Sequence, residues 1–490
     1  MKKEKIKKLS LLIVGLFALI ICALLYIFTF NGAKQQLTPF FSARAEDKVI
    51  VLNWYVPAET VDIIVIKDNK HAEKLGGFKG SGKYYFTDGD HGKNYYFKLE
   101  YTDNDGQKQN ISFIRKFLDF TKLPDMEILY IDTEDGQDPT YTAAKKPDKN
   151  LFGVGISNND YKNAKLNNDI PVKIKIRGNV SAYRPKKSYK IVLKEKKDLL
   201  NLGKEYADTE WVLLGKDSLI RQYFGLHIGM LLGMNWEPRM RFVNLMLNGN
   251  WKGLYILCES IKVHPKRVAV KKDGFLIESD VYFWKEKAPV VTSPLLSDKV
   301  KFVFKYPKFT SNSDKRLFAI GQRIKKIDDA VKAKSENIGD LIDFDTFAGW
   351  GLAHEMMGTM DGYGSNAFFY QYDKNSKLKM GPLWDFDTIL SNPSDKKATF
   401  LSAKTTYVPL LLEIPGFREF YKNKYFAVAP SIEQKMKSVL EKLKDIPGLE
   451  QSIAQDDILA SQISLDGEIK FLLGALHDKI VWLNEEFKKF

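Results

Sequence analysis

The chain has 490 residues, of which 44% are hydrophobic and 13% aromatic, a composition typical of a packed globular protein with two or three domains and unlike that of a disordered one. Its formal net charge of +14 comes from 75 Lys and Arg against 61 Asp and Glu. Because the lysines after the N-terminal tail alternate with acidic residues, they indicate a solvated surface and not a nucleic-acid-binding one. The two cysteines, Cys22 and Cys258, are too few for a disulfide framework or a structural zinc site.

The N-terminal segment predicts a membrane anchor. Residues 1–10 contain five lysines and one glutamate, and Leu11–Phe30 is a run of twenty residues without a charge, which is long enough to span a bilayer. Because a basic flank stays in the cytoplasm, we expect a single-pass protein of the cell membrane whose N-terminus is cytoplasmic and whose bulk is extracytoplasmic. A cleaved signal peptide is the alternative, but the apolar run is longer than usual for one and no small-x-small cleavage site follows it.

Residues 36–119 predict a small β-sandwich. Turn sequences such as KDNK and DNDG separate short runs with the alternation of strands. These runs are Lys48–Tyr55, Val61–Ile66, Lys83–Thr87, Tyr95–Thr102 and Asn110–Arg115. The segment resembles a fibronectin type III domain, with Trp54 in VLNWYVP at the place of the buried strand-B tryptophan and the alternating residues Tyr95–Tyr101 at the place of strand F. The resemblance implies a spacer or binding module without catalysis.

Residues 123–490 predict a larger α+β domain with a strand-rich N-terminal half, a helical C-terminal half and a cleft between them. Strands are expected at MEILYIDT, VKIKIRGN, SYKIVLK, MRFVNLMLNG, WKGLYILCES and DGFLIES. The helix Ser218–Leu232 begins at a capping residue and ends before Gly233. In the second half, NAFFYQYD and KLKMGPLWDFD interrupt the helical pattern. The helices expected there are Asp314–Lys334, Asp345–Met357, Ile414–Lys422, Ser431–Lys444 and Leu465–Phe487.

Two short motifs carry the candidate chemistry. MDGYGSN contains Asp361 and, five positions later, Asn366, and GPLWDFD supplies Asp385 and Asp387. Phosphoryl transfer needs a carboxylate near the acceptor hydroxyl, oxygen ligands for Mg²⁺ and a cation on the nucleotide phosphates, and protein kinases place an Asp, an Asn and a second Asp in this order. Strand alternation should bury both aromatic residues of WDFD and turn both aspartates to the other side. The alternative is a Gly-rich turn in which Asp and Asn bond only to backbone.

The stretch IRGNVSAYRPKKSYKIVLK contains the candidate for the positive side chain that would bind the nucleotide phosphates. Lys190 lies mid-strand between Tyr189 and Ile191, like the lysine on the third strand of protein kinases. Lys186 and Lys187 lie at the entrance of this strand, where a lysine is more often solvated. Lys190 is therefore the candidate phosphate-binding residue, and a solvated lysine on an exposed strand face is its alternative.

Together these stretches resemble the CotH kinase family, the spore-coat-protein-H type of atypical kinase. The resemblance runs from about Leu123 to the C-terminus. It is carried, in order, by IKIRGNVSAYRPKKSYKIVL, EWVLLGKDSLIRQYFGLHIG, NGNWKGLYILCESIKV, GFLIESD and MDGYGSNAFFYQYDKNSKLKMGPLWDFD. It implies a kinase-like fold, ATP with Mg²⁺ or Mn²⁺, and transfer of phosphate to protein Ser or Thr hydroxyls.

The same resemblance implies roles for single residues. Asp361 would be the catalytic carboxylate, and Lys190 would contact the phosphates during catalysis. Arg177 would contact the nucleotide, with an ion pair that fixes the turn as its alternative. Glu259 would hold Lys190 or contact the nucleotide, with a surface carboxylate as its alternative. The metal ligands would be Asn366, Asp385 and Asp387. The chain has no GxGxxG loop, no His-Arg before Asp361 and no Gly after WDFD, so the nucleotide contacts of ordinary protein kinases do not carry over.

The predicted function is that of a membrane-anchored extracytoplasmic kinase acting on surface or secreted proteins. Its partners would be a protein with Ser or Thr acceptors, a nucleotide, and the membrane through the N-terminal helix, while nucleic acid is excluded and the oligomeric state is left open. Two alternatives remain. A degenerate cleft would make the protein a non-catalytic surface binding protein or scaffold, and the basic surface would suit a transferase that modifies anionic envelope polymers.

Overall fold

The computed structural model describes residues 38–67, 71–146, 153–157, 159–216, 218–296, 298–359, 362, 365–390, 406–461 and 464–489. The chain divides into two compact units, Met1–Lys122 and Leu123–Phe490. Each unit has its own hydrophobic core, so each can be understood from its own packing.

The predicted membrane anchor, Leu11–Phe30, and the basic tail before it lie outside the described residues. Across the ranges that the structure does describe, no helix is both long enough and apolar enough to cross a membrane. The predicted localisation as a single-pass membrane protein is therefore corrected, because no described helix supports it.

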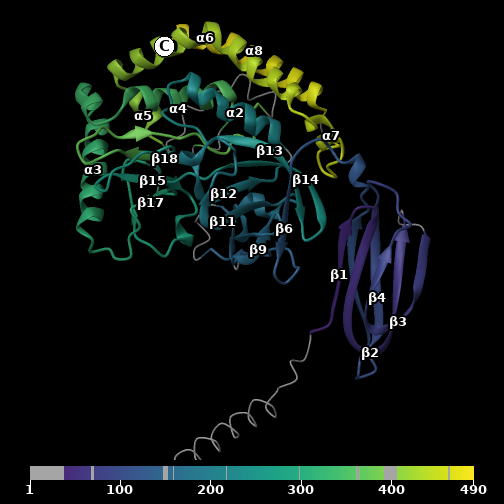
Figure 1. Ribbon diagram of the computed structural model, residues 1–490. Coiled ribbons are helices and arrows are strands. Elements are labelled where there is room, and N and C mark those ends of the chain that lie inside the picture. Colours follow the sequence, from purple (N-terminus) through teal and green to yellow (C-terminus); the bar gives the residue numbers. More distant parts are fainter. Residues whose placement is uncertain are drawn as a thin grey trace, which may run out of the picture. The chain divides into compact units, whose positions relative to one another are not determined.

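The first unit is one antiparallel sheet of five strands in the order β1-β2-β4-β5, with β3 paired to β2 (Figure 1). The two predicted runs at 48–55 and 61–66 form one long strand, because a register shift between Tyr55 and Thr60 carries the chain past Pro57. Trp54 is buried as expected, and its Nε1 donates to the carbonyl of Lys79 at 2.9 Å. Since all five strands belong to one connected sheet, the predicted two-sheet sandwich is not shown. The strands are β1 (Phe40–Glu46), β2 (Val49–Lys67), β3 (His71–Phe86), β4 (Asn94–Thr102) and β5 (Lys108–Lys116).

The second unit begins with a closed barrel in the order β10-β11-β12-β14-β13-β6-β9. Strands β6, β9 and β10 alternate buried and more exposed residues, whereas β13 and β14 are buried along most of their length. Barrel closure places the apolar residues from Ile174 and Ile191 to Trp211 and Leu257 in one core. The small ribbon of β7 (Thr142–Ala144) and β8 (Gly155–Ser157) is separate. The barrel strands are β6 (Ile128–Thr133), β9 (Lys162–Leu166), β10 (Ile170–Arg177), β11 (Ser188–Lys197), β12 (Asp208–Leu214), β13 (Met240–Leu247) and β14 (Asn250–Glu259).

A second sheet and the helices complete this unit. The sheet order is β16-β17-β15-β18-β19. Figure 1 shows α6 and α8 as an outer layer over α2 and α4. Helix α4 is buried on nearly all sides, which explains its apolar sequence. The strands are β15 (Phe275–Asp280), β16 (Val290–Val291), β17 (Lys301–Tyr306), β18 (Ala367–Gln371) and β19 (Lys379–Met380). The helices are α2 (Leu219–Leu231), α3 (Lys315–Lys332), α4 (Phe344–Met357), α5 (Val408–Leu411), α6 (Pro415–Glu441), α7 (Leu449–Ala454) and α8 (Leu465–Lys488).

The predicted α+β class, with strands in the first half and helices toward the C-terminus, is confirmed, but two elements differ from expectation. The helices predicted at 414–422 and 431–444 are one helix, α6, with Pro430 inside it. The core contacts of buried residues on both sides of Pro430, such as Tyr425 and Ile432, offset the hydrogen bond that proline cannot donate. The strand expected in KLKMGPLWDFD stops at Met380, because Pro382 cannot pair within a sheet.

Helix α2 packs against the WDFD segment through a glycine. A methyl group added at Gly225 would lie only 2.5 Å from Cβ of Phe386, although residue 225 lies within the helix. Close packing therefore excludes any larger side chain at this position.

We expect Gly225→Ala to lower the free energy of unfolding by about 1–3 kcal/mol, because overpacking outweighs the gain of about 1 kcal/mol in helix propensity. Urea unfolding followed by circular dichroism measures this. The matched control is Gly321→Ala in α3, where an added Cβ meets no atom within 4 Å and alanine should stabilise the protein. Equal shifts in the two variants would contradict the predicted contact.

Candidate functional site

A cleft of ≈ 820 Å³ opens in the second unit. One wall comes from the barrel, at the ends of β10, β11 and β12, and the other from β15, β17 and β18 of the five-stranded sheet. Every residue that lines the cleft belongs to the second unit. The predicted site residues among them are Arg177, Lys190, Asn366, Asp385 and Asp387.

Asn366 and Asp385 lie side by side in this cleft. The amide Nδ2 of Asn366 donates to Oδ2 of Asp385 at 3.4 Å. Both residues have a φ of 64°, in the left-handed region that Asn and Asp enter more readily than other residues with a side chain. Two separate sharp turns of the backbone, 19 positions apart, therefore bring these polar groups together.

The WDFD segment presents its aspartates to the cleft without being a strand. Trp384 and Phe386 are buried, as the alternating pattern predicts, and Asp385 and Asp387 line the cleft, but Trp384 lines it as well. The guanidinium of Arg177 lies 5.2 Å from the ring centre of Trp384, so a positive charge covers the outer face of this aromatic side chain.

Lys216 forms ion pairs with both Asp385 and Asp387, and none of the sequence motifs predicts this role. It follows β12, and its side chain is only 4% exposed. Its Nζ donates to Oδ1 of Asp385 and lies 2.8 Å from Oδ2 of Asp387. Arg184 adds a longer contact of 3.7 Å to Asp387. The available signal was a lysine placed directly after the apolar run WVLLG and before the cap of a helix, where it could hardly reach solvent.

Burial and charge act in opposite directions on these groups. Burial lowers the pKa of Lys216, but the two carboxylates outweigh it and the pKa is raised. Burial raises the pKa of Asp385, yet the charge and hydrogen bond of Lys216 hold it below its usual value. The pKa of Asp387 is raised, chiefly by burial and then by the charge of Asp385, against the effect of Lys216. Asp385 is thus the more strongly ionised carboxylate of the pair.

Lys190 projects from β11 into the cleft and is tied to an acidic neighbour. Its Nζ lies 2.5 Å from Oε2 of Glu210 on β12, and Lys262 approaches the same carboxylate at 3.5 Å. Burial raises the pKa of Glu210, but Lys190 and then Lys262 outweigh it, so the net shift is downward. A fixed carboxylate on the adjacent strand therefore orients Lys190.

Glu259 is placed differently from its predicted role. Its buried carboxylate accepts from Nε and from one terminal nitrogen of Arg239 at 2.8 and 2.7 Å, and Nε of Arg267 lies 3.3 Å away. It is not among the residues that line the cleft, and Lys190 pairs with Glu210 instead. Two arginines therefore compensate the charge of Glu259, and the structure does not bring it together with the predicted site residues of the cleft. Asp361, the predicted catalytic carboxylate, lies outside the described residues.

The oxygen donors of the cleft fit a small divalent cation. Mg²⁺ takes one or two protein carboxylates and completes its shell with phosphate oxygens and water. Asp385 and Asp387 supply the carboxylates, and Asn366 would present its Oδ1 if its amide turned over. In the part of the chain that the structure describes, no group of three His, Cys, Asp or Glu side chains could hold a metal on its own.

The opposite wall carries a second charged cluster. Nζ of Lys305 lies 2.5 Å from Oε2 of Glu278, and the backbone N–H of Tyr282 donates to Oδ1 of Asp280 at 2.8 Å. Burial and the neighbouring charge of Glu278 raise the pKa of Asp280 to about 7. This carboxylate therefore titrates near neutral pH inside the cleft.

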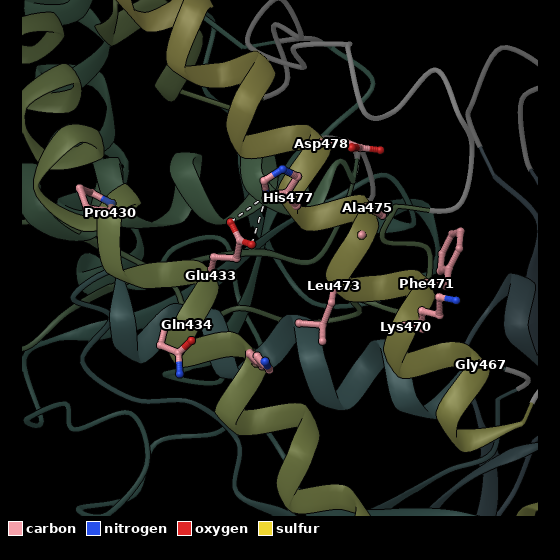
Figure 2. A pocket seen from close by; sticks show the side chains of 12 residues that line it. Pro430, Glu433, Gln434, Gly467, Lys470, Phe471, Leu473, Ala475, His477 and Asp478 are labelled. Atoms are coloured by element: carbon pink, nitrogen blue, oxygen red, sulfur yellow. Dashed lines mark hydrogen bonds and ion pairs between the residues drawn. The ribbon is translucent and has the colours of Figure 1, made fainter.

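A larger hollow of ≈ 960 Å³ lies between α6 and α8 (Figure 2). Glu433 on α6 faces His477 on α8, with 3.2 Å between Oε2 and Nδ1. Figure 2 shows the remaining side chains spread along the two helices, without a cluster of groups directed at one point. None of the predicted site residues that the structure describes lines this hollow, whereas five of them line the cleft.

The comparison with protein-family models agrees with the sequence resemblance. The family described as CotH kinase protein matches residues 174–446, which is more than half of the chain. Among solved structures, the chain is similar to the crystal structure of CtkA, a proinflammatory kinase of Helicobacter pylori, with 11% identity and a TM-score of 0.25 over 70% of this chain and 96% of that chain. No curated protein matches the chain.

Asp280 predicts a pH dependence of stability. A carboxylate whose pKa is higher in the folded state binds more protons there, so stability falls as the pH rises from the ordinary value of 3.8 to about 7. Asp280→Asn removes this loss and should raise the melting temperature at pH 8 relative to wild type, with a smaller effect at pH 5. Thermal unfolding at both pH values tests this, with the exposed Asp329→Asn as control. A gain that is equal at the two pH values would rule out the proposed titration.

Proposed function

This chain belongs to the CotH kinase family, and we propose that its second unit transfers the terminal phosphate of ATP to Ser or Thr hydroxyls of proteins. The main support for this proposal is that oxygen donors and positive side chains converge in one cleft. The donors are Asn366, Asp385 and Asp387, and the positive side chains are Arg177, Lys190 and Lys216. For residues 36–119 we propose a spacer or binding role without chemistry.

We assign Asn366, Asp385 and Asp387 as the residues that would hold Mg²⁺, with Mn²⁺ as a substitute. When bound, the ion would neutralise and orient phosphate oxygens of the nucleotide. A metal-binding carboxylate must be ionised, and the lowered pKa of Asp385 keeps it so at neutral pH. The raised pKa of Asp387 makes it the weaker candidate ligand.

Arg177 and Lys190 are the proposed phosphate contacts on the barrel side of the cleft. Arg177 lies at the end of β10 and is positioned by the ring of Trp384. Lys190 is oriented by Glu210, which limits the number of positions its ammonium can occupy. Such fixed cations stabilise the charge on the transferred group without needing to reorganise during the reaction.

Asp361 is the proposed proton acceptor, from its place in the MDGYGSN motif. The acceptor hydroxyl would donate its proton to this carboxylate while its oxygen forms a bond to the terminal phosphorus and the bond from that phosphorus to ADP breaks.

One observation favours an alternative, a scaffold that binds a ligand and transfers nothing. Lys216, together with Arg184 at 3.7 Å from Asp387, already compensates the charge of both aspartates, so their burial does not by itself require a metal. The two functions differ in whether ATP is consumed, and this difference decides the experiment.

We expect the purified full chain to transfer label from γ-labelled ATP with Mg²⁺ to itself or to basic, Ser-rich peptides. Asp361→Ala should lower turnover by about 10²–10⁴-fold, because it removes the proton acceptor. Asp385→Asn should also abolish most of the activity, and asparagine tolerates the φ of 64° at this position. Asp329→Asn, on the exposed face of α3, should leave turnover unchanged.

Thermal unfolding with and without Mg²⁺ and ATP separates the possible outcomes. Stabilisation by the nucleotide without any transfer of label would support the scaffold. If the nucleotide does not stabilise the protein and no label is transferred, both the kinase function and nucleotide binding in the cleft are ruled out.

A further inference from the structure

The position of Lys216 suggests a role beyond charge compensation. We propose that its ammonium occupies the place of a divalent cation between Asp385 and Asp387, so that metal binding displaces it and makes it available to the phosphate of the nucleotide. The identity of the metal and the nucleotide rests on the proposed function. The competition itself needs no nucleotide, because it involves these three side chains, the guanidinium of Arg184 beside Asp387, and a divalent cation.

Charge is the first argument. Lys216 and Asp387 have side chains only 4% and 5% exposed, and Asp385 is 30% exposed. Charges so deeply buried need a partner, and the ammonium of Lys216 together with the guanidinium of Arg184, 3.7 Å from Asp387, balances the two carboxylates. A divalent cation in the same place would raise the net charge of this cluster to +2. The added positive charge would repel the ammonium toward the next available anion.

The path for this displacement is the second argument. Lys216 lies between the end of β12 at Leu214 and the start of α2 at Leu219, and it also lines the cleft. Its backbone neighbour is fixed, because the N–H of Gly215 donates to Oγ of Ser188 at 3.0 Å. The four-carbon side chain can therefore swing its ammonium from the carboxylates into the cleft by rotamer changes alone.

Lys190 is the natural comparison, because it is also a cleft lysine in an ion pair. Its carboxylate partner, Glu210, is shared with Lys262 and belongs to the barrel wall. Neither contact involves a proposed metal ligand. A change at Lys190 should therefore leave the affinity for a metal alone unaffected, whereas a change at Lys216 should alter it.

The test is the binding of Mn²⁺ without nucleotide to the full chain, measured by titration calorimetry. Lys216→Met removes the competing charge and keeps the length of the side chain, so we expect at least about tenfold tighter binding than in wild type, since each tenfold corresponds to 1.4 kcal/mol. Lys216→Arg should resemble wild type, and so should Lys190→Met. Asp385→Asn should weaken the binding of Mn²⁺, which would show that the ion binds at this carboxylate. Unchanged or weaker binding by Lys216→Met, or undiminished binding by Asp385→Asn, would overturn the proposal.

A measurement on the unmodified protein covers the case in which Lys216→Met fails to fold. Acylation of lysine amines, mapped by mass spectrometry, should label Lys216 faster when Mn²⁺ is present, because the ammonium leaves its buried position. Lys186, which is buried against Asp456, serves as the internal control. Equal labelling of Lys216 with and without Mn²⁺ would contradict the displacement. If phosphate transfer occurs but neither measurement responds, the proposed function survives and this inference fails.

Discussion

The ion pairs of Lys216 with Asp385 and Asp387 join two parts of the second unit that the backbone brings together only through tertiary folding. Lys216 follows a strand of the barrel, and the aspartates follow the last strand of the other sheet. Removing one member would leave an uncompensated buried charge, a defect that costs about 3–5 kcal/mol. Phe386, between the two aspartates, packs against Gly225 of α2. Charge and close packing therefore hold the same short segment from two sides.

A second set of buried charges organises the barrel wall. Each member lies within ion-pair distance of the next, and burial of several members makes the pairing obligatory. The series runs through Arg239, Glu259, Arg267, Asp208, Lys262, Glu210 and Lys190. The orientation of Lys190 in the cleft thus depends on residues at the far end of β14, which gives Glu259 an indirect structural part even though it does not reach the cleft.

Local patterns were sufficient for most of the elements and for part of the site. The alternating pattern predicts the burial of Trp384 and Phe386, although this segment is not a strand. The helical pattern predicts α2 to within one residue at each end, although the side chain of Ser218 makes no capping hydrogen bond. The pairing of Lys216 with Asp385 could not be predicted from the sequence, because it joins residues 169 positions apart and leaves no periodic signal. The continuity of α6 through Pro430 was also missed, because the burial that offsets the lost hydrogen bond is a tertiary property. The membrane anchor remains a sequence pattern that no described helix supports.

The left-handed backbone at Asn366 and Asp385 limits which amino acids can replace them without strain. A residue with a Cβ atom, other than asparagine or aspartate, strains such a backbone by roughly 1–2 kcal/mol, whereas glycine does not. Most single substitutions would therefore weaken the fold at the same time as they remove the polar group. The easiest inactivating replacements are confined to glycine and to exchange between the acid and its amide, so loss of chemistry and loss of folding are tightly linked at these two positions.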